Sequence, residues 1–175
     1  MRILLATLAS ILAALIVQPV VLFVWAFLPA LFLPAGLPWN ELPIMGLLVI
    51  AYASPFVILL GVPLTLMLHR FGKFSWWPLA LAGTFAGGLF IGWSGPGSVK
   101  GFSSGGSWYG GYREFIVDGQ PTAYGWLNYL QSVAGFSLHG LIGATVFYLV
   151  WSRWMAKEPA HQPIKLSALG QPKSH

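Results

Sequence analysis

Residues 44–68 read IMGLLVIAYASPFVILLGVPLTLML and contain no Asp, Glu, Lys or Arg. A bilayer core about 30 Å thick needs about 20 apolar helical residues to cross it, whereas apolar segments of water-soluble domains are shorter and interrupted by charges. Three further stretches share this character, over residues 3–33, 77–93 and 126–151. The four stretches predict four transmembrane helices.

The composition supports the same fold class. Hydrophobic residues make up 57% of the 175-residue chain and charged residues 7%, with a mean hydropathy of +0.73. This is too little polar surface to cover a water-soluble globule. Helices satisfy every backbone hydrogen bond within one segment, so we expect an all-α membrane protein. A single transmembrane domain is predicted over residues 1–154, and a polar, proline-containing disordered tail over residues 155–175.

The charged residues predict the orientation of the chain. Arg2 precedes the first stretch, Arg70 and Lys73 follow the second, and Arg153 follows the fourth. Glu41 is the only charged residue between the first two stretches. Because Lys and Arg concentrate in the short cytoplasmic segments of membrane proteins, we expect both termini in the cytoplasm. The loops around Glu41 and over residues 94–125 then lie outside a bacterial-type inner membrane.

Several classes of function receive no support from the sequence. The net charge is +5, but the basic residues are scattered over the flanks of the spans. This distribution indicates membrane topology, and we expect no nucleic-acid partner. The chain has no cysteine, which excludes disulfides and thiolate metal sites. No phosphate-binding loop, zinc-protease motif or nucleophile elbow is present. We therefore expect no catalytic set, no cofactor and no metal.

Glycines recur at helical spacing in the last two stretches: Gly83, Gly87, Gly88, Gly92, Gly135, Gly140 and Gly143. Small residues allow helix backbones to approach closely, and in lipid this close packing drives helix association. We expect the helices over residues 77–93 and 126–151 to contact each other at these positions.

Polar residues within the spans are candidates for function, because burying them in lipid is costly unless they are paired or face a cavity. The set consists of Gln18, Asn128, Gln131, Ser137 and His139. Two interpretations are open. The residues can form hydrogen bonds between helices, or they can line the water path of a small oligomeric channel or transporter.

The outer loop, residues 94–125, has two parts. Its first half, up to residue 111, is so rich in Gly and Ser that we expect no regular structure without a partner. Its second half predicts a hairpin, because the apolar residues 115–117 are followed by Asp118-Gly119, a dipeptide typical of tight turns. Pro121 places the second strand at an edge.

The residues of this loop predict contact with a partner. The candidate contact residues are aromatic or basic: Trp108, Tyr109, Tyr112, Arg113, Phe115 and Tyr124. Such side chains are enriched where proteins meet, although contact with lipid headgroups explains them equally well. We expect a non-enzymatic protein of the lipid bilayer that binds a protein partner or a second copy of itself through this outer loop and the packed helices, as a complex subunit, assembly factor or immunity-like protein. Besides the channel, the alternative is a lipid- or glycan-modifying enzyme that uses Glu114 and Asp118.

Overall fold

The computed structural model describes residues 1–27, 39–97 and 99–156, and these are mostly helical. The elements in chain order are α1 (Arg2–Leu22), the π-helical η1 (Phe23–Phe27), α2 (Leu42–Phe56), the π-helical η3 (Val57–Gly61), α3 (Val62–Arg70), α4 (Trp76–Gly92), β1 (Ser104–Trp108), β2 (Gly111–Val117), β3 (Gln120–Pro121) and α5 (Ala123–Ala156).

Three helical segments are long and apolar enough to cross a membrane: Arg2–Trp25, Leu42–Arg70 and Ala123–Ala156. The fourth apolar helix, α4, has 17 residues and is shorter. A helix-rich membrane protein is therefore supported. The all-α prediction is wrong in one respect, because residues 104–121 contain a three-stranded sheet. The predicted end of the first span, over residues 28–33, and the predicted tail from residue 157 onward lie outside the described residues.

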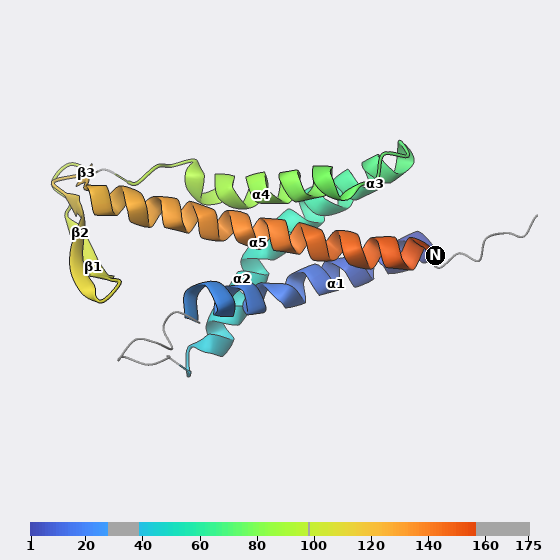
Figure 1. The fold of residues 1–175 in the computed structure, drawn as a ribbon, viewed down its shortest axis with the longest axis horizontal. Helices are drawn as coiled ribbons and strands as arrows, with labels where there is room; N and C mark the ends of the chain where they lie inside the picture. Colours follow the sequence, from blue (N-terminus) through green and yellow to red (C-terminus); the bar gives the residue numbers. More distant parts are fainter. Residues whose placement is uncertain (28–38, 98, 157–175) are drawn as a thin grey trace, which may run out of the picture.

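α5 forms the long axis of the molecule (Figure 1). α1 and α4 lie along it and make most of its helical contacts, while α2 and α3 cross it obliquely. The start of α1, the turn between α3 and α4, and the end of α5 lie at one end, which we call the terminal end. The sheet lies at the opposite end, the sheet end.

The irregular helical turns lie close to prolines. Pro55 has no N–H to donate to the Ala51 carbonyl, and the Ser54 hydroxyl donates to that oxygen instead, at 3.0 Å. The π-helical segment η3 follows immediately, and Pro63 comes at the start of α3. In α1, Pro19 likewise precedes η1. Prolines and π-turns are where helices bend.

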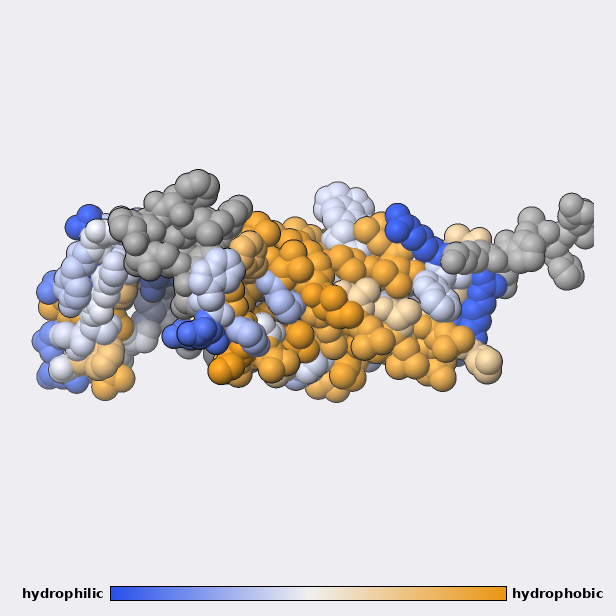
Figure 2. All heavy atoms as spheres, turned by 90° about the horizontal axis from the view of Figure 1, so that it is seen from below, coloured by the Kyte–Doolittle hydropathy of each residue, from blue (hydrophilic) through white to orange (hydrophobic). Residues whose placement is uncertain are grey.

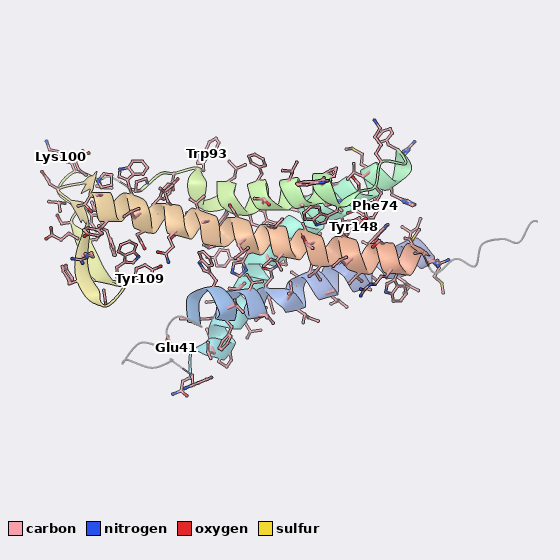
Figure 3. The ribbon with its side chains drawn as sticks, viewed as in Figure 1. Glu41, Phe74, Trp93, Lys100, Tyr109 and Tyr148 are labelled. Carbon is pink, nitrogen blue, oxygen red and sulfur yellow. The ribbon has the colours of Figure 1, made fainter. Side chains whose placement is uncertain are left out.

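Aromatic side chains form the core at the terminal end. The buried cluster contains Phe147 and Trp151, whose rings stack at 6.2 Å, together with two alanines of α1. From the segment that joins α3 to α4, Phe74 packs on this cluster and stacks on Tyr148 at 5.2 Å (Figure 3). These contacts hold α1, the α3–α4 turn and α5 together at this end.

The hydropathy of the surface varies along the long axis. Apolar residues dominate the middle of the face shown in Figure 2, and hydrophilic residues gather at its two ends. Many large apolar side chains of α2 and η3 are exposed, among them Leu47, Leu48 and Leu59. Water-soluble monomers rarely expose a continuous apolar surface of this kind, which is typical of proteins solvated by lipid.

Candidate functional site

The contact between α4 and α5 is built on glycine. A Cβ atom added to Gly83 would overlap the carbonyl oxygen of Gly140, and one added to Gly140 would overlap that of Gly83. A Cβ added to Gly87 would overlap the carbonyl oxygen of Phe136. The predicted contact between these two helices is present, and it joins one backbone directly to the other.

The same contact continues toward the sheet end and becomes looser at Gly92. A Cβ on Gly88 would overlap the Ser137 hydroxyl oxygen. At Gly92 a Cβ would be 4.0 Å from the Tyr129 hydroxyl oxygen, which is an ordinary contact. The Tyr129 hydroxyl donates to the Gly92 carbonyl at 2.9 Å and fixes the last turn of α4 on α5.

The other two predicted packing glycines of α5 face α1 instead of α4. A Cβ on Gly135 would lie 2.7 Å from Nε1 of Trp25, and one on Gly143 would lie 2.7 Å from Nε2 of Gln18. The prediction that all these glycines serve one helix pair is therefore wrong for Gly135 and Gly143. α5 carries glycine on two sides because two helices pack on it.

Gln18 and His139 form a polar link between α1 and α5. His139 Nδ1 lies 2.8 Å from Gln18 Oε1. Gln18 Nε2 donates to the Ala14 carbonyl at 3.0 Å and to the His139 carbonyl at 3.4 Å. Because carbonyl oxygens only accept, the amide NH₂ is directed to them and Oε1 to the ring, so Nδ1 is the donor. The neutral imidazole then keeps Nε2 as an acceptor.

The remaining polar residues of α5 have different neighbours. Gln131 Oε1 accepts a hydrogen bond from the Trp108 indole at 3.1 Å. Ser137 lies against α4 at Gly88. The backbone carbonyl of Asn128 accepts from the Ser132 hydroxyl at 2.9 Å, a bond within α5. Gln131 therefore contacts the sheet, Ser137 contacts α4, and His139 contacts Gln18 of α1. Within the described residues, this arrangement gives a channel lined by one continuous polar stripe no support.

A cavity of about 510 Å³ lies among α1, α2, η3, α4 and α5. Its wall is apolar apart from a few side chains, chiefly Gln18, Ser132 and His139. Leu48, Tyr52 and Phe90 line it and are also exposed at the molecular surface, so the cavity opens between α2 and α4. The volume falls within the range of small-molecule sites, roughly 300–1,000 Å³.

The sheet has the strand order β1-β2-β3 and is antiparallel. The predicted hairpin after residue 114 is confirmed, because Val117 pairs with Gln120 across a two-residue turn. The turn residues Asp118 and Gly119 have φ values of 49° and 77°. Positive φ at both positions matches the type I′ turn that fits strand twist. Pro121 lies in the edge strand, as predicted.

The prediction that the Gly/Ser-rich half lacks regular structure is wrong. Its residues 104–108 form β1, which pairs with β2 through a second two-residue turn at Tyr109 and Gly110. Their φ values are 48° and 82°. Tyrosine is uncommon at positive φ, so this turn has a weak signal in the sequence.

The sheet is fixed to the start of α5 by Thr122. Its hydroxyl accepts from the Gly125 N–H at 3.1 Å, as an N-cap residue does, and donates to the Glu114 carbonyl at 2.6 Å. The Thr122 N–H donates to the Phe115 carbonyl at 2.9 Å. One residue thus begins the helix and holds β2 against it.

Two further contacts attach the sheet to α5. The bond from Trp108 to Gln131 attaches the end of β1, and the guanidinium of Arg113 lies 4.7 Å from the ring centre of Tyr124. Phe115 shares the sheet face of Arg113 because strand residues alternate between faces. Trp108, Arg113 and Tyr124 therefore hold the sheet in place, whereas we predicted them as contact residues on a flexible loop.

The opposite face of the sheet is free of α5. Tyr112 and Glu114 of β2 and Ser107 of β1 share it, by the register and the alternation of strand residues. Tyr112 is 70% exposed, and Tyr109 at the adjacent turn is 72% exposed (Figure 3). We call this surface, with residues 107, 112 and 114, the outer face; the Tyr109 ring lies 4.9 Å from that of Trp108, on the side toward α5.

The two carboxylates considered for catalysis have different surroundings. Asp118 Oδ1 accepts from the Gly101 N–H at 3.0 Å, and the Asp118 N–H donates to the Ser103 hydroxyl at 3.0 Å. These bonds fix the turn against the preceding loop. Glu114 is exposed on the outer face. Nothing in this geometry favours a paired acid and base.

Comparison with known proteins adds nothing to this geometry. No family model, curated protein or solved structure matches the chain at a significant level. Among the described residues, His, Asp and Glu side chains do not gather in groups of three that could hold a metal. The outer face and the cavity are therefore the two candidate sites.

Proposed function

We propose that the chain crosses a bacterial-type inner membrane four times, with both termini cytoplasmic and the sheet outside. The terminal end carries Arg2, Arg70 and Arg153, which follows the distribution of basic residues on the cytoplasmic side. Arg2 Nη2 also donates to the Trp154 carbonyl at 2.9 Å, which joins the first and last helices there. The apolar middle of the surface supports the same placement.

Single cysteines test this topology, because the chain has none of its own. Ser107→Cys lies in the sheet and Ser75→Cys at the start of α4. A membrane-impermeant maleimide added to intact spheroplasts should label the first variant, and the second only after permeabilisation. The reverse pattern would refute the orientation.

We further propose that the protein is non-enzymatic and binds a partner protein. In this complex a strand of the partner pairs with the free edge of β1. The observation that carries this is that β1 is an edge strand: within the described residues it pairs with β2 alone. Edge strands of natural proteins are usually protected by Lys, Pro or an inward charge, and SGGSW has none of these. An unprotected edge is a site for β-strand addition.

The glycines of β1 favour an incoming strand. Gly105 and Gly106 have no side chains to obstruct a neighbour, and the exposed Tyr112 ring lies across Gly105. Tyr109 and Tyr112 then supply aromatic contact area beside the edge, which is typical of protein interfaces. In such a complex the chain acts as a subunit, an assembly factor or an immunity-like antagonist.

Ser107 gives the sharpest test of this edge. Paired residues of an antiparallel ladder alternate between hydrogen-bonded and non-hydrogen-bonded pairs, and Trp108–Gly111 closes the two-residue turn. The backbone N–H of Ser107 is therefore directed to the open edge. Ser107→Pro removes this donor and leaves the β1–β2 bonds in place, whereas Ser107→Val keeps the donor and changes only the side chain.

We expect a partner recovered in mild detergent with the native chain and with Ser107→Val to be lost with Ser107→Pro. A photo-crosslinking residue at position 112 should identify the bound protein, and a crosslink to a second copy of the chain would make the partner the protein itself. Equal recovery with both variants would refute strand addition at β1.

A further inference from the structure

We propose that the cavity between α2 and α4 binds a lipid alcohol, a molecule with an apolar body and one hydroxyl group that enters from the bilayer. His139 Nε2 would accept the hydrogen bond from this hydroxyl. The inference concerns a region remote from the outer face, and it stands even if the partner experiment at Ser107 fails.

The preference for a hydrogen-bond donor follows from the Gln18–His139 link. Gln18 fixes the ring proton on Nδ1, which leaves Nε2 as the remaining polar atom of the ring. His139 lines the cavity. Within residues 1–27, 39–97 and 99–156, Nε2 has no hydrogen-bond partner. A polar atom at bilayer depth is costly without one, and a ligand hydroxyl can supply it.

A hydroxyl also suits a second group on the wall. Trp25 lines the same cavity with its indole nitrogen against Gly135, and this N–H has no acceptor in the part of the chain that the structure describes. An indole nitrogen only donates, whereas Nε2 of His139 only accepts in this tautomer. A hydroxyl both donates and accepts, so its chemistry suits both groups.

The rest of the cavity accounts for the apolar body. Phe136 and Phe90 follow the His139 ring toward the surface, with ring centres 6.5 Å and 6.1 Å apart in succession. Tyr52 of α2 meets Phe90 at 5.8 Å, edge to face. This row of rings runs from the polar link to the exposed entrance and offers aromatic contact to an apolar chain or ring system along its length.

A matched pair of probes tests the proposal: a photoreactive long-chain alcohol and its methyl ether. The binding of each is measured by competition in nanodiscs that contain the full chain. The two share the apolar body, and both can accept from Trp25, so only the donor to His139 differs. We expect the alcohol to bind about tenfold more tightly than the ether, the value of one hydrogen bond of roughly 1.4 kcal/mol.

Variants of the polar link then separate recognition from folding. In His139→Leu the alcohol should bind no better than the ether, while binding of the ether itself is unchanged and shows that the cavity is intact. Gln18→Met should weaken the preference without removing it, because the ring can then carry its proton on either nitrogen. Ser137→Ala is the control, since Ser137 faces α4 outside the cavity.

Three results would overturn the proposal: equal binding of alcohol and ether by the native chain, a preference that survives His139→Leu, or no specific labelling of the cavity by either probe. Equal binding would indicate an acyl chain as the occupant, because an acyl chain has no donor.

Discussion

The surfaces that α4 and α2 turn toward the rest of the molecule are similar in hydropathy but differ in residue size. On the α4 side, Gly83 and Gly140 bring the backbones into direct contact. On the α2 side, large side chains border a cavity, and the most apolar part of residues 42–70 has no buried residue. In lipid, large aliphatic side chains gain little by leaving the solvent. Residue size, more than hydropathy, therefore determines which of these helices pack.

The strongest test of this comparison exchanges one glycine on each side for alanine. In Gly140→Ala the new Cβ would overlap the Gly83 carbonyl oxygen, a backbone atom that cannot move without separating the helices. We expect a loss of about 3 kcal/mol in the free energy of unfolding. In Gly61→Ala the nearest atom is 4.0 Å away, and alanine favours the helix, so stability should be unchanged or slightly raised.

The free energy of unfolding of both variants is measured by titration with a denaturing detergent, with unfolding followed by tryptophan fluorescence. If Gly61→Ala is as damaging as Gly140→Ala, the α2 side is packed as tightly as the α4 side and the comparison fails.

A smaller effect is expected on the other side of α5, where α1 packs. In Gly143→Ala the added Cβ would lie 2.7 Å from the end of the flexible Gln18 side chain, which can move at lower cost than a backbone. The expected loss is about 1 kcal/mol, the value of the displaced hydrogen bond to His139. In the background Gln18→Leu this loss should largely disappear. A loss that is the same in both backgrounds would mean that the cost arises elsewhere.

The attachment of the sheet gives a local effect of similar size. Trp108→Phe keeps an aromatic ring but removes the indole donor to Gln131, so β1 should open more easily by about 1 kcal/mol. Hydrogen exchange of the amides of residues 104–108 measures this opening. Tyr109→Phe is the matched control, because Tyr109 is exposed at the turn and should leave exchange unchanged. Unchanged exchange in Trp108→Phe would contradict the attachment.

These contacts also show how far the sequence alone could lead. The long apolar helices and the α4–α5 contact were predictable, because length and glycine spacing act within one or two neighbouring segments. The hairpin at Asp118-Gly119 was predictable for the same reason, since the dipeptide itself favours the turn. Each of these signals is local in the chain.

The features that the sequence did not predict depend on distant partners. The strand β1 consists largely of Gly and Ser, which have low intrinsic strand preference, and pairing with β2 and the Trp108–Gln131 bond stabilise it. The Gln18–His139 link joins residues 121 positions apart. Gln18 could be named as a candidate partner, but the proton position on the ring follows only from the full hydrogen-bond network. The side on which Gly135 and Gly143 pack likewise depends on where α1 lies.

The smallest effect is expected at a large residue on the open side. Leu47 of α2 is 67% exposed. In Leu47→Ala the shorter side chain loses contact with lipid, while alanine has a slightly higher helix propensity than leucine. In water the loss of a buried leucine costs about 2–5 kcal/mol, but lipid tails are as apolar as leucine, so here we expect a change below about 0.5 kcal/mol. The measurement uses the same detergent titration as Gly140→Ala. A loss above about 1 kcal/mol would mean that something other than lipid covers Leu47, and a second copy of the chain against α2 would be the first candidate. The entrance of the cavity would then face a protein neighbour, and both the size argument and the lipid route to His139 would have to be revised.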